Sequence, residues 1–295
     1  MSNATPLASN LKNRFAPFDA ALQAAFDNNI RTAIAEDVGS GDVTGKLVPA
    51  DGMVQARVIV REAAVLCGAP WFDAVMLQLD ARIRIDWHYA EGDLMIADSA
   101  VCTIEAPARA LLTAERSALN FLQLLSGVAT ATRHYVNVIA GTRAHILDTR
   151  KTLPGLRLAQ KYAVRVGGGQ NQRLALYDGI LIKENHIAAA GGITAAMRAA
   201  QNLDAGVTIQ VEVESLVQLE EALAAGASSV LLDNFSLAAM RDAVNLTAGR
   251  ALLEASGGIN METVRAIAET GVDRISIGSL TKDIRATDYS LRIVE

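Results

Sequence analysis

Charged side chains end several short apolar runs in the second half of the sequence. Lys183 closes the run that starts at residue 180, Asp233 closes the run that starts at residue 229, and Asp148 follows the run that starts at residue 145. Parallel β-strands bring their carboxyl ends to one edge, where α/β enzymes build their active sites. At such an edge, lysine and arginine bind anionic groups and carboxylates hold metal ions. These positions therefore predict an active site.

The segment from residue 207 to residue 214 adds carboxylates to this edge. Its odd-numbered positions hold valine or isoleucine, whereas Gln210, Glu212 and Glu214 share the opposite face. Successive strand residues face opposite sides, so the acids point into a barrel interior that branched apolar side chains normally fill. Glu212 and Asp233 together fit Mg²⁺, which uses one or two carboxylates and completes its coordination with phosphate oxygens and water. A buried structural ion-pair network is the competing interpretation.

Basic residues gather in the same part of the chain. Between residues 143 and 183 eight basic residues stand against two acidic ones, although the whole chain carries a formal charge of −5. Such segregation favours a pocket for a strongly anionic small molecule, with a solvated basic face as the alternative. The eight are Arg143, Arg150, Lys151, Arg157, Lys161, Arg165, Arg173 and Lys183.

Two glycine-containing turns follow late strand-like runs. Ser256-Gly257-Gly258 follows one run, and Gly278-Ser279 follows the last. Backbone amides without a neighbouring Cβ can approach a phosphate closely, as in the late loops of phosphate-binding barrels. With Glu212 and Asp233 nearby, these turns predict binding of a diphosphate bridged by a metal ion.

The elements that position these residues alternate regularly. Seven strand-like runs are separated by alanine-rich helical segments, which favours a parallel sheet closed into a barrel. The chain is therefore expected to be an α/β protein with an incomplete, seven-stranded α/β barrel over residues 128–284. The seven runs are 145–149, 164–166, 179–183, 207–214, 229–233, 251–255 and 274–278.

The first half of the chain has a different pattern. Residues 54–60 and 81–87 alternate apolar and polar positions as half-buried antiparallel strands do. A helix is expected from Arg109 to Leu125, with Ser126-Gly127 as its end. The expected organisation is an N-terminal tail (1–20), an α+β open-sandwich domain (21–127), the barrel, and a C-terminal segment (285–295) that packs back on the sandwich domain.

Composition limits the class of protein. The chain has 295 residues, 51% of them hydrophobic, and no apolar run long enough to span a bilayer. An acidic balance with 4% aromatic residues argues against a nucleic-acid surface. Cys67 and Cys102 lack metal-ligand spacing and are expected to be free buried thiols. A cytoplasmic enzyme without membrane or nucleic-acid partners is expected.

A series of motifs resembles those of quinolinate phosphoribosyltransferases. The resemblance runs in order from about residue 36 to Gly278 and includes Asp-Thr-Arg-Lys-Thr-Leu-Pro-Gly at 148–155 and Leu-Ile-Lys-Glu-Asn-His at 181–186. It implies an N-terminal sandwich, a seven-stranded barrel and a homodimer, or a higher oligomer, with active sites at the subunit interface. It also implies Mg²⁺-dependent conversion of quinolinate and 5-phosphoribosyl 1-pyrophosphate to nicotinate mononucleotide, pyrophosphate and CO₂. The remaining motifs lie at 113–130, 161–169, 212–214, 232–235 and 255–258.

The resemblance also implies roles for individual residues. Lys151, Lys183, Glu212 and Asp233 would be catalytic, with Glu212 and Asp233 also holding the metal. Quinolinate would be bound by Arg150, Gln172, Arg173 and Lys183, and by Arg116 from the neighbouring subunit. Phosphoribosyl pyrophosphate would be bound by Lys151, Glu212, Asp233, Ser256, Gly257, Gly258, Gly278 and Ser279.

One position departs from the family pattern. The family commonly has histidine where this chain has Gln172, which can donate a hydrogen bond but cannot carry a proton. Three other functions remain as alternatives: a paralogue acting on another aromatic acid, a non-catalytic sensor of phosphoribosyl pyrophosphate, and a Schiff-base lyase that uses Lys183.

Overall fold

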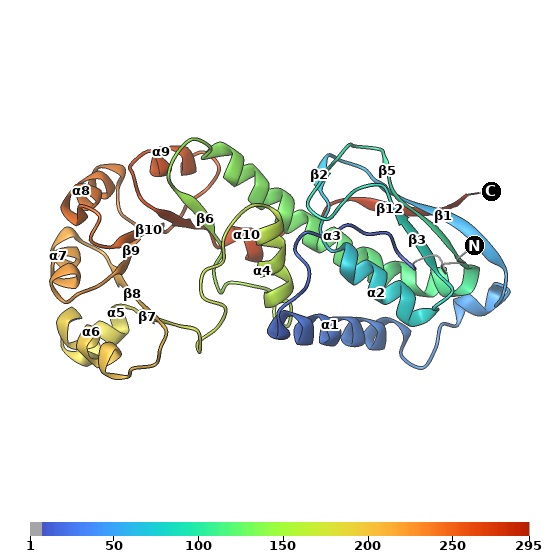
Figure 1. The fold of residues 1–295 in the computed structure, drawn as a ribbon, viewed down its shortest axis with the longest axis horizontal. Helices are drawn as coiled ribbons and strands as arrows, with labels where there is room; N and C mark the ends of the chain where they lie inside the picture. The colour runs from blue at the N-terminus through green and yellow to red at the C-terminus, as the bar shows by residue number, and fades with distance from the viewer. Residues whose placement is uncertain (1–7, 295) are drawn as a thin grey trace, which may run out of the picture. The chain divides into compact units, whose positions relative to one another are not determined.

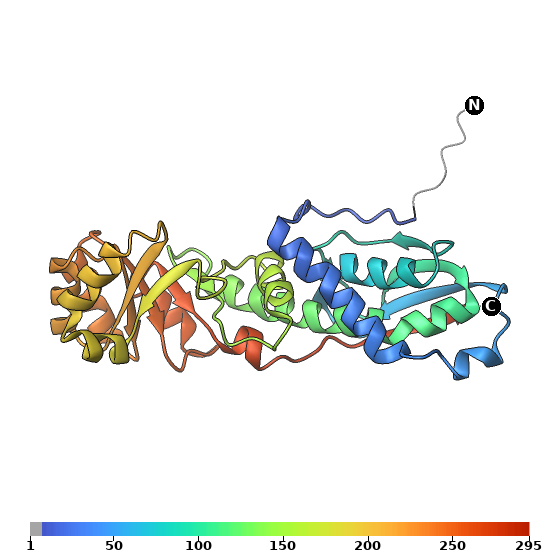
Figure 2. The ribbon, with the colours of Figure 1, turned by 90° about the horizontal axis from the view of Figure 1, so that it is seen from below.

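The computed structural model describes residues 8–294, which divide into two compact units (Figures 1 and 2). Unit 1 contains residues 8–131, Leu153–Gly167 and 284–294, and unit 2 contains Thr132–Thr152 and Gly168–Asp283. Each unit is therefore built from more than one stretch of chain. The expected tail (1–20) and C-terminal segment (285–295) fall partly outside the described residues, at 1–7 and 295.

Unit 1 is built on a four-stranded antiparallel sheet. The strand order is β12-β1-β5-β3, and a separate pair joins β2 to β4. The alternation expected for the two early strands is confirmed: Ala56, Val58 and Val60 of β1 are fully buried, whereas Gln55 and Arg57 are exposed. The strands are β1 (Met53–Val60), β2 (Ala64–Val65), β3 (Arg84–Trp87), β4 (Leu94–Met95), β5 (Ala100–Pro107) and β12 (Tyr289–Val294).

Helices cover this sheet around an aromatic centre. The ring of Trp71 lies 5.0 to 5.6 Å from the rings of Phe18, Phe26 and Tyr162, and both Trp71 and Tyr162 are buried. Aromatic rings bury much apolar area, so this cluster ties three helices together. Helix α1 lies against both α2 and α4. The helices of unit 1 are α1 (Ala20–Val38), the 3₁₀ turn η1 (Thr44–Leu47), α2 (Ala69–Leu79), α4 (Arg157–Val166) and the larger part of α3 (Ala108–Val138), whose last residues belong to unit 2.

The chain before α1 packs on unit 1. The backbone carbonyl of Ala8 accepts a hydrogen bond from the amide of Ile85, and Lys12 accepts one from Glu91. The Ser9 hydroxyl donates to Asp73 over 2.6 Å. These bonds hold the described part of the expected tail against β3 and α2.

The helix expected from Arg109 to Leu125 is longer than predicted. Helix α3 runs from Ala108 to Val138, so the assignment of Ser126-Gly127 as its end was wrong. A Cβ on Gly127 would lie 2.3 Å from the carbonyl oxygen of Arg285. The Ser126 hydroxyl donates to the carbonyl of Cys67 over 2.9 Å. Both residues serve close packing inside a continuing helix.

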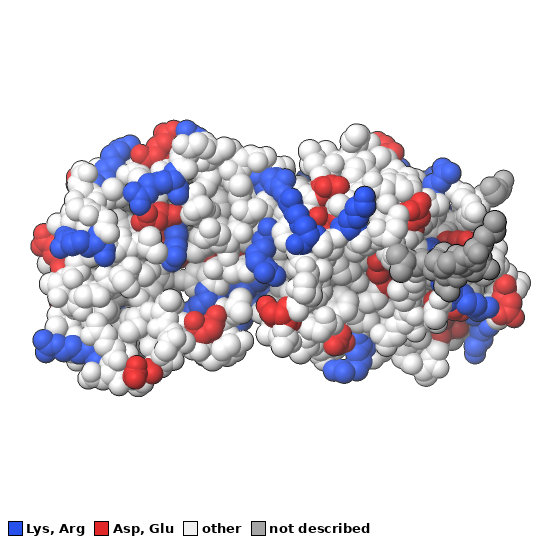
Figure 3. Space-filling view, in the orientation of Figure 1, with Lys and Arg blue, Asp and Glu red and all other residues white. Residues whose placement is uncertain are grey.

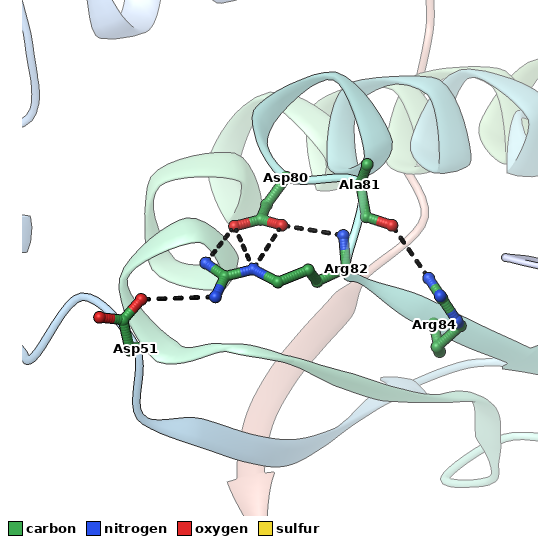
Figure 4. A network of polar contacts seen from close by, with 5 residues as sticks. All are labelled: Asp51, Asp80, Ala81, Arg82 and Arg84. Atoms are coloured by element: carbon green, nitrogen blue, oxygen red, sulfur yellow. Dashed lines mark hydrogen bonds and ion pairs between the residues drawn. The ribbon is translucent and has the colours of Figure 1, made fainter.

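An ion pair closes the turn between α2 and β3 (Figure 4). The Arg82 guanidinium lies 2.7 Å from Oδ2 of Asp80 and 3.4 Å from Oδ1 of Asp51. The hydrogen bonds from Arg82 lower the pKa of Asp80. Because the Arg82 side chain is half exposed, this pair defines the turn but contributes little to stability.

Unit 2 is built on a six-stranded parallel sheet. The strand order is β6-β11-β10-β9-β8-β7, and helices follow most strands. An isolated parallel bridge adds Gln170 next to Leu147 of β6. The strands are β6 (His145–Leu147), β7 (Gly179–Ile182), β8 (Thr208–Val213), β9 (Ser229–Asp233), β10 (Leu252–Ser256) and β11 (Arg274–Ser276). The helices are α5 (Glu184–Ala190), α6 (Ile193–Asn202), α7 (Leu216–Ala224), α8 (Leu237–Thr247), α9 (Val264–Ala268) and α10 (Ser279–Lys282).

The strand expected at residues 164–166 was wrong. This segment forms the last turn of α4, which belongs to unit 1. Tyr162, Ala163 and Val166 are buried there, because the helical period turns them toward the core of unit 1. The same helix carries Arg157, Lys161 and Arg165, so three of the eight clustered basic residues belong to unit 1.

The two cysteines and the apolar character of the helices were both subjects of expectations from composition. Cys67 and Cys102 are free and buried, as expected. No helix within residues 8–294 combines the length and apolar character needed to cross a bilayer. Side chains of both charge signs appear on the face of each unit shown in Figure 3.

Candidate active site

The carboxyl ends of the parallel strands in unit 2 surround a cavity of about 160 Å³. Its polar lining comes from the chain after β6, the loop before β7, and the ends of β7, β8, β10 and β11. The placement predicted from strand parity is therefore correct for this edge of the sheet. Seven predicted site residues line the cavity: Arg150, Lys151, Gln172, Arg173, Lys183, Glu212 and Ser256.

An ion pair crosses this cavity between two neighbouring strands. Nζ of Lys183 lies 3.2 Å from Oε2 of Glu212, whose side chain is 11% exposed. Burial raises the pKa of Glu212, the Lys183 ammonium opposes that rise, and the charges of Asp233 and Glu184 reinforce it. The ionisation of Glu212 thus responds to one cation, Lys183, and to two anions, Asp233 and Glu184.

Two guanidinium groups face the same space. Burial lowers the pKa of Arg173, and the charge of Arg150 lowers it further. Nη1 of Arg173 donates to the carbonyl of Gly179 over 2.8 Å, which anchors the side chain at the start of β7. Two cations held close together in a partly buried cavity favour an anionic ligand. Guanidinium forks suit carboxylates in particular.

A buried carboxylate below the cavity holds the turn that carries Arg173. Asp148 is fully buried and accepts hydrogen bonds from Nδ2 of Asn171 over 2.6 Å and from the backbone amide of Gln172 over 2.9 Å. The side chain of Gln172 donates to Gln210 over 2.7 Å and accepts from the backbone amide of Arg173 over 2.7 Å. Gln172 therefore makes protein contacts on both sides of its amide.

Asp233 lies outside the lining of the cavity but close to it. It is the last residue of β9, pairs in register with Ser256 of β10, and accepts a hydrogen bond from Nδ2 of Asn234 over 2.9 Å. Its charge also acts on Glu212. The two predicted metal-binding carboxylates thus belong to neighbouring strands.

The predicted phosphate-binding glycines permit close approach of side chains. A Cβ on Gly278 would lie 3.1 Å from Cδ of Lys151, so the absence of a side chain makes room for that lysine. Gly257 has φ +101°, and a Cβ there would lie 2.1 Å from Oδ1 of Asn234. Gly257, Gly258, Gly278 and Ser279 are not among the residues that line the cavity.

Arg116 belongs to unit 1, unlike the other predicted site residues. It lies in the middle of α3 with an exposed side chain, and it does not line the cavity of unit 2. The structure contains one chain, so the expected contribution of Arg116 to a neighbouring subunit stays a prediction.

Metal binding by the protein alone has little support. Among residues 8–294, no group of three or more His, Cys, Asp or Glu side chains is placed to hold a metal ion. The two predicted metal ligands at this edge are the Glu212 and Asp233 carboxylates. Two carboxylates fit Mg²⁺ when a phosphate-bearing substrate supplies the remaining oxygen ligands.

Glu254 lines the cavity but was not among the predicted site residues. Glu254 is 1% exposed and accepts a hydrogen bond from Nε2 of Gln210 over 3.0 Å. The parity argument that selected Glu212 applies equally to Glu254, a single carboxylate within the apolar run at 251–255. That signal was present in the sequence. Thr149, Leu181, Leu231 and Ser276 complete the lining.

The chain is similar to a known protein family and to several known proteins. The family described as quinolinate phosphoribosyl transferase matches with its N-terminal domain at residues 42–126 and its C-terminal domain at residues 128–292. A probable nicotinate-nucleotide pyrophosphorylase [carboxylating] of Bacillus subtilis is 41% identical, over 88% of this chain and 90% of that protein. The Mycobacterium leprae nicotinate-nucleotide pyrophosphorylase [carboxylating] is 42% identical, over 92% of this chain and 98% of that protein.

Solved structures give the same result. The nicotinate-nucleotide pyrophosphorylase of Francisella tularensis superimposes with a TM-score of 0.91 at 44% identity, over 95% of this chain and 99% of that chain. Both domain families match in the expected order and together cover more than half of the sequence. The chain therefore belongs to the quinolinate phosphoribosyl transferase family.

Proposed function

We propose that this protein transfers the phosphoribosyl group of 5-phosphoribosyl 1-pyrophosphate to quinolinate and releases CO₂. The products are nicotinate mononucleotide and pyrophosphate, and the reaction (EC 2.4.2.19) feeds NAD synthesis. The observation that carries the proposal is the cavity of unit 2, where Arg150, Lys151, Arg173 and Lys183 converge beside Glu212. Family membership and high coverage of the relatives support the same activity.

Binding of quinolinate follows from the cations of the cavity. Quinolinate carries two adjacent carboxylates on a planar ring, and Arg150, Arg173 and Lys183 supply three positive charges at one edge of the sheet. Paired guanidinium and ammonium groups orient such a dianion and remove its charge repulsion. We assign the two carboxylates to these residues, with Gln172 beside them and Arg116 of a second subunit completing the site.

Phosphoribosyl pyrophosphate is assigned to the side of the cavity that Lys151 and Ser256 line. Lys151 lies against Gly278, and Ser256 is the last residue of β10, where it pairs with Asp233 of β9. We propose that Lys151 neutralises the leaving pyrophosphate, that Ser256, Gly257, Gly258, Gly278 and Ser279 contact phosphate, and that Glu212 and Asp233 hold the metal and the ribose hydroxyls. Mg²⁺, when bound there with the substrate, supplies charge neutralisation on the pyrophosphate.

The chemistry proceeds with little covalent help from the protein. The ring nitrogen attacks C1 of the ribose while the bond from C1 to pyrophosphate breaks. The ribosylated ring is positively charged and accepts the electron pair left at C2 when CO₂ departs, and C2 then takes a proton. The side chains that we assign position the two substrates and compensate charge.

Two further features belong to the proposal. The six parallel strands, with Gln170 bridged to β6, are consistent with an incomplete barrel, which we propose as the architecture of unit 2. We also propose a homodimer, because Arg116 is exposed on α3 and does not line the cavity in its own chain. A cytoplasmic location stays a prediction from composition.

The Schiff-base alternative does not fit the geometry. A Schiff-base lysine needs a neutral amine in an apolar or cationic setting, whereas Lys183 pairs with the Glu212 carboxylate at 3.2 Å.

Product analysis tests the proposed activity. Purified protein is incubated with quinolinate, phosphoribosyl pyrophosphate and Mg²⁺, and nicotinate mononucleotide and pyrophosphate are measured by chromatography. Equal amounts of both products are expected. An Arg173→Ala variant should lose about 100-fold or more in kcat/KM, whereas Arg198→Ala, on the exposed face of α6, should not.

Two results would reject the proposal. Binding of both substrates without product would favour a sensor. Turnover of a different aromatic acid in preference to quinolinate would favour a paralogous activity.

A further inference from the structure

A chain of hydrogen bonds links a buried carboxyl to the backbone of Arg173. Nε2 of Gln210 donates to Oε2 of Glu254 over 3.0 Å, and Nε2 of Gln172 donates to Oε1 of Gln210 over 2.7 Å. The backbone amide of Arg173 then donates to Oε1 of Gln172 over 2.7 Å. The links come from β10, from β8 and from the loop before β7.

The carboxyl at one end sets the direction of every bond in this chain. Glu254 presents an acceptor to Gln210, so the NH₂ group of Gln210 faces Glu254 and its carbonyl oxygen faces Gln172. Gln172 must then turn its own NH₂ group toward Gln210, which leaves its oxygen for Arg173. Reversing either amide would set two donors or two acceptors against each other, at the cost of unsatisfied buried groups.

Cavities lie on two sides of Gln172, Arg173 and Glu254, so these residues depend on hydrogen bonds for their position. Gln172, Arg173 and Glu254 line both the substrate cavity and a second cavity of about 340 Å³. Residues at the starts of β8, β9 and β10 line the second cavity. Side-chain packing therefore gives these three residues less support than a closed core would, and the bonds supply the missing constraint.

The direction of these hydrogen bonds does not depend on the protonation state of Glu254. Oε1 of Glu254 makes no hydrogen bond with the described residues, whereas Oε2 holds Gln210. Burial raises the pKa of Glu254, and the polar groups around it, first Gln210 and then Ser276, oppose that rise. A proton on Oε1 leaves Oε2 as the acceptor, so the direction of the chain is the same in both protonation states.

We propose that Glu254 is a positioning residue of the quinolinate site, which acts through Gln210 and Gln172 to fix the backbone of Arg173 and so aim its guanidinium at the substrate. This inference rests on the proposed function, in which Arg173 binds a quinolinate carboxylate. It also gives Gln172 a specific task in this protein, because the amide of a glutamine can accept from Arg173 and donate to Gln210 at once.

Steady-state kinetics of three variants test the proposal. Glu254→Leu keeps the volume but removes the acceptor, and should raise the KM for quinolinate about 10- to 100-fold. The KM for phosphoribosyl pyrophosphate and kcat should stay within about threefold of wild type. Glu254→Gln keeps an acceptor for Gln210, and its KM for quinolinate should stay close to wild type. Gln210→Leu breaks the chain while leaving Glu254 in place, and provides the test if Glu254→Leu does not fold.

A double variant separates action through Gln172 from a general packing defect. If Glu254 acts through Gln172, then Gln172→Leu raises the KM for quinolinate, and adding Glu254→Leu raises it little further. Thr247→Val is the matched control, because the buried Thr247 hydroxyl in α8 makes no hydrogen bond with the described residues. The control should leave both KM values unchanged.

The outcomes are distinct. Wild-type protein that fails to convert quinolinate contradicts the proposed function itself. Active wild-type protein with folded Glu254→Leu and Gln210→Leu variants of normal quinolinate KM overturns the positioning role alone. A Glu254→Gln variant that loses kcat at unchanged KM also overturns it, because the carboxyl would then act in the chemical step.

Discussion

Nζ of Lys183 lies 3.2 Å from Oε2 of Glu212, across the neighbouring parallel strands β7 and β8. This pair joins a proposed ligand of quinolinate to a proposed ligand of the metal. The Lys183 charge lowers the pKa of Glu212, and the Asp233 charge raises it. The two proposed substrate subsites are therefore electrostatically coupled through this pair.

Replacing Lys183 should therefore affect both substrates. Lys183→Ala should reduce kcat/KM for quinolinate about 100-fold or more, because the quinolinate carboxylate that Lys183 binds loses its cationic partner. It should also shift the acidic limb of the pH profile for phosphoribosyl pyrophosphate to higher pH, because the pKa of Glu212 rises further. Initial rates across a pH series measure both effects, with Arg198→Ala as the control. An unchanged acidic limb would separate Glu212 from the second substrate.

Substrate choice should follow the number of carboxylates. Nicotinate lacks the 2-carboxylate of quinolinate, so one cation among Arg150, Arg173 and Lys183 would be left without a partner in the cavity. We expect kcat/KM for nicotinate to be lower by about 100-fold or more. Competition assays with both acids measure the ratio directly. Comparable rates would mean that the cavity does not recognise both carboxylates.

Glu91 should make the stability of the protein depend on pH. It is buried in unit 1, accepts hydrogen bonds from the amides of Gly68 and Ala69 over 2.8 and 3.2 Å, and accepts one from the Tyr162 hydroxyl. Burial raises its pKa from 4.5 to about 7. Its stabilising contribution is thus complete below about pH 4.5 and is lost as pH rises to about 7.

A comparison with Glu91→Gln isolates this effect. Over that interval the free energy of unfolding of wild type should fall relative to the variant by an amount on the order of 3 kcal/mol at most. Thermal unfolding at several pH values measures it, and Asp73, whose pKa burial raises to about 6, contributes equally to both proteins. Parallel curves for the two proteins would show that the pKa of Glu91 is not raised.

Gly127 should tolerate no side chain. Because a Cβ there would lie 2.3 Å from the carbonyl oxygen of Arg285, Gly127→Ala should destabilise unit 1 by about 2 to 3 kcal/mol. Gly52→Ala is the control, since its nearest neighbour would be an ordinary contact at 3.9 Å. Denaturant unfolding compares the two. Equal stability of both variants would mean that the backbone of residue 285 moves aside easily.

Mixed dimers test the proposed role of Arg116. Arg116→Ala and Lys183→Ala should each retain about one hundredth of wild-type activity or less as pure dimers. After refolding together at equal concentration, half of the dimers are mixed and each mixed dimer has one intact site, so activity should return to roughly a quarter of wild type. Mixed dimers detected by native mass spectrometry without recovered activity would exclude action across a subunit interface.

Strand parity predicted which charged side chains share one edge of the sheet, but it could not reveal every partner. Lys183 and Glu212 stand out because each is a charge within an apolar run, and the structure places both in the cavity. The bonds from Glu254 to Gln210 and Gln172 join segments far apart in sequence, and each segment alone gives no sign of the others. Only the structure gives the register of β8, β9 and β10, which brings these side chains together.

Local signals also failed where tertiary packing decided the outcome. Ser126-Gly127 is typical of a helix end, yet the pair lies inside α3 because the chain near Arg285 crosses the helix at Gly127. Val164 and Val166 favour a strand by composition. The same segment is helical in the structure, where Tyr162 packs in an aromatic core. In both cases a distant part of the chain determined the local structure.

The pairing of β12 with β1 has a consequence for the order in which this protein can fold during synthesis. Val60 pairs with Tyr289, so the first sheet to leave the ribosome lacks one edge strand until translation is nearly complete. Until then β1 presents unpaired backbone groups, which makes the nascent chain prone to association with other chains. Unit 2 needs no residue beyond Asp283, and it can complete its sheet first although it is encoded later.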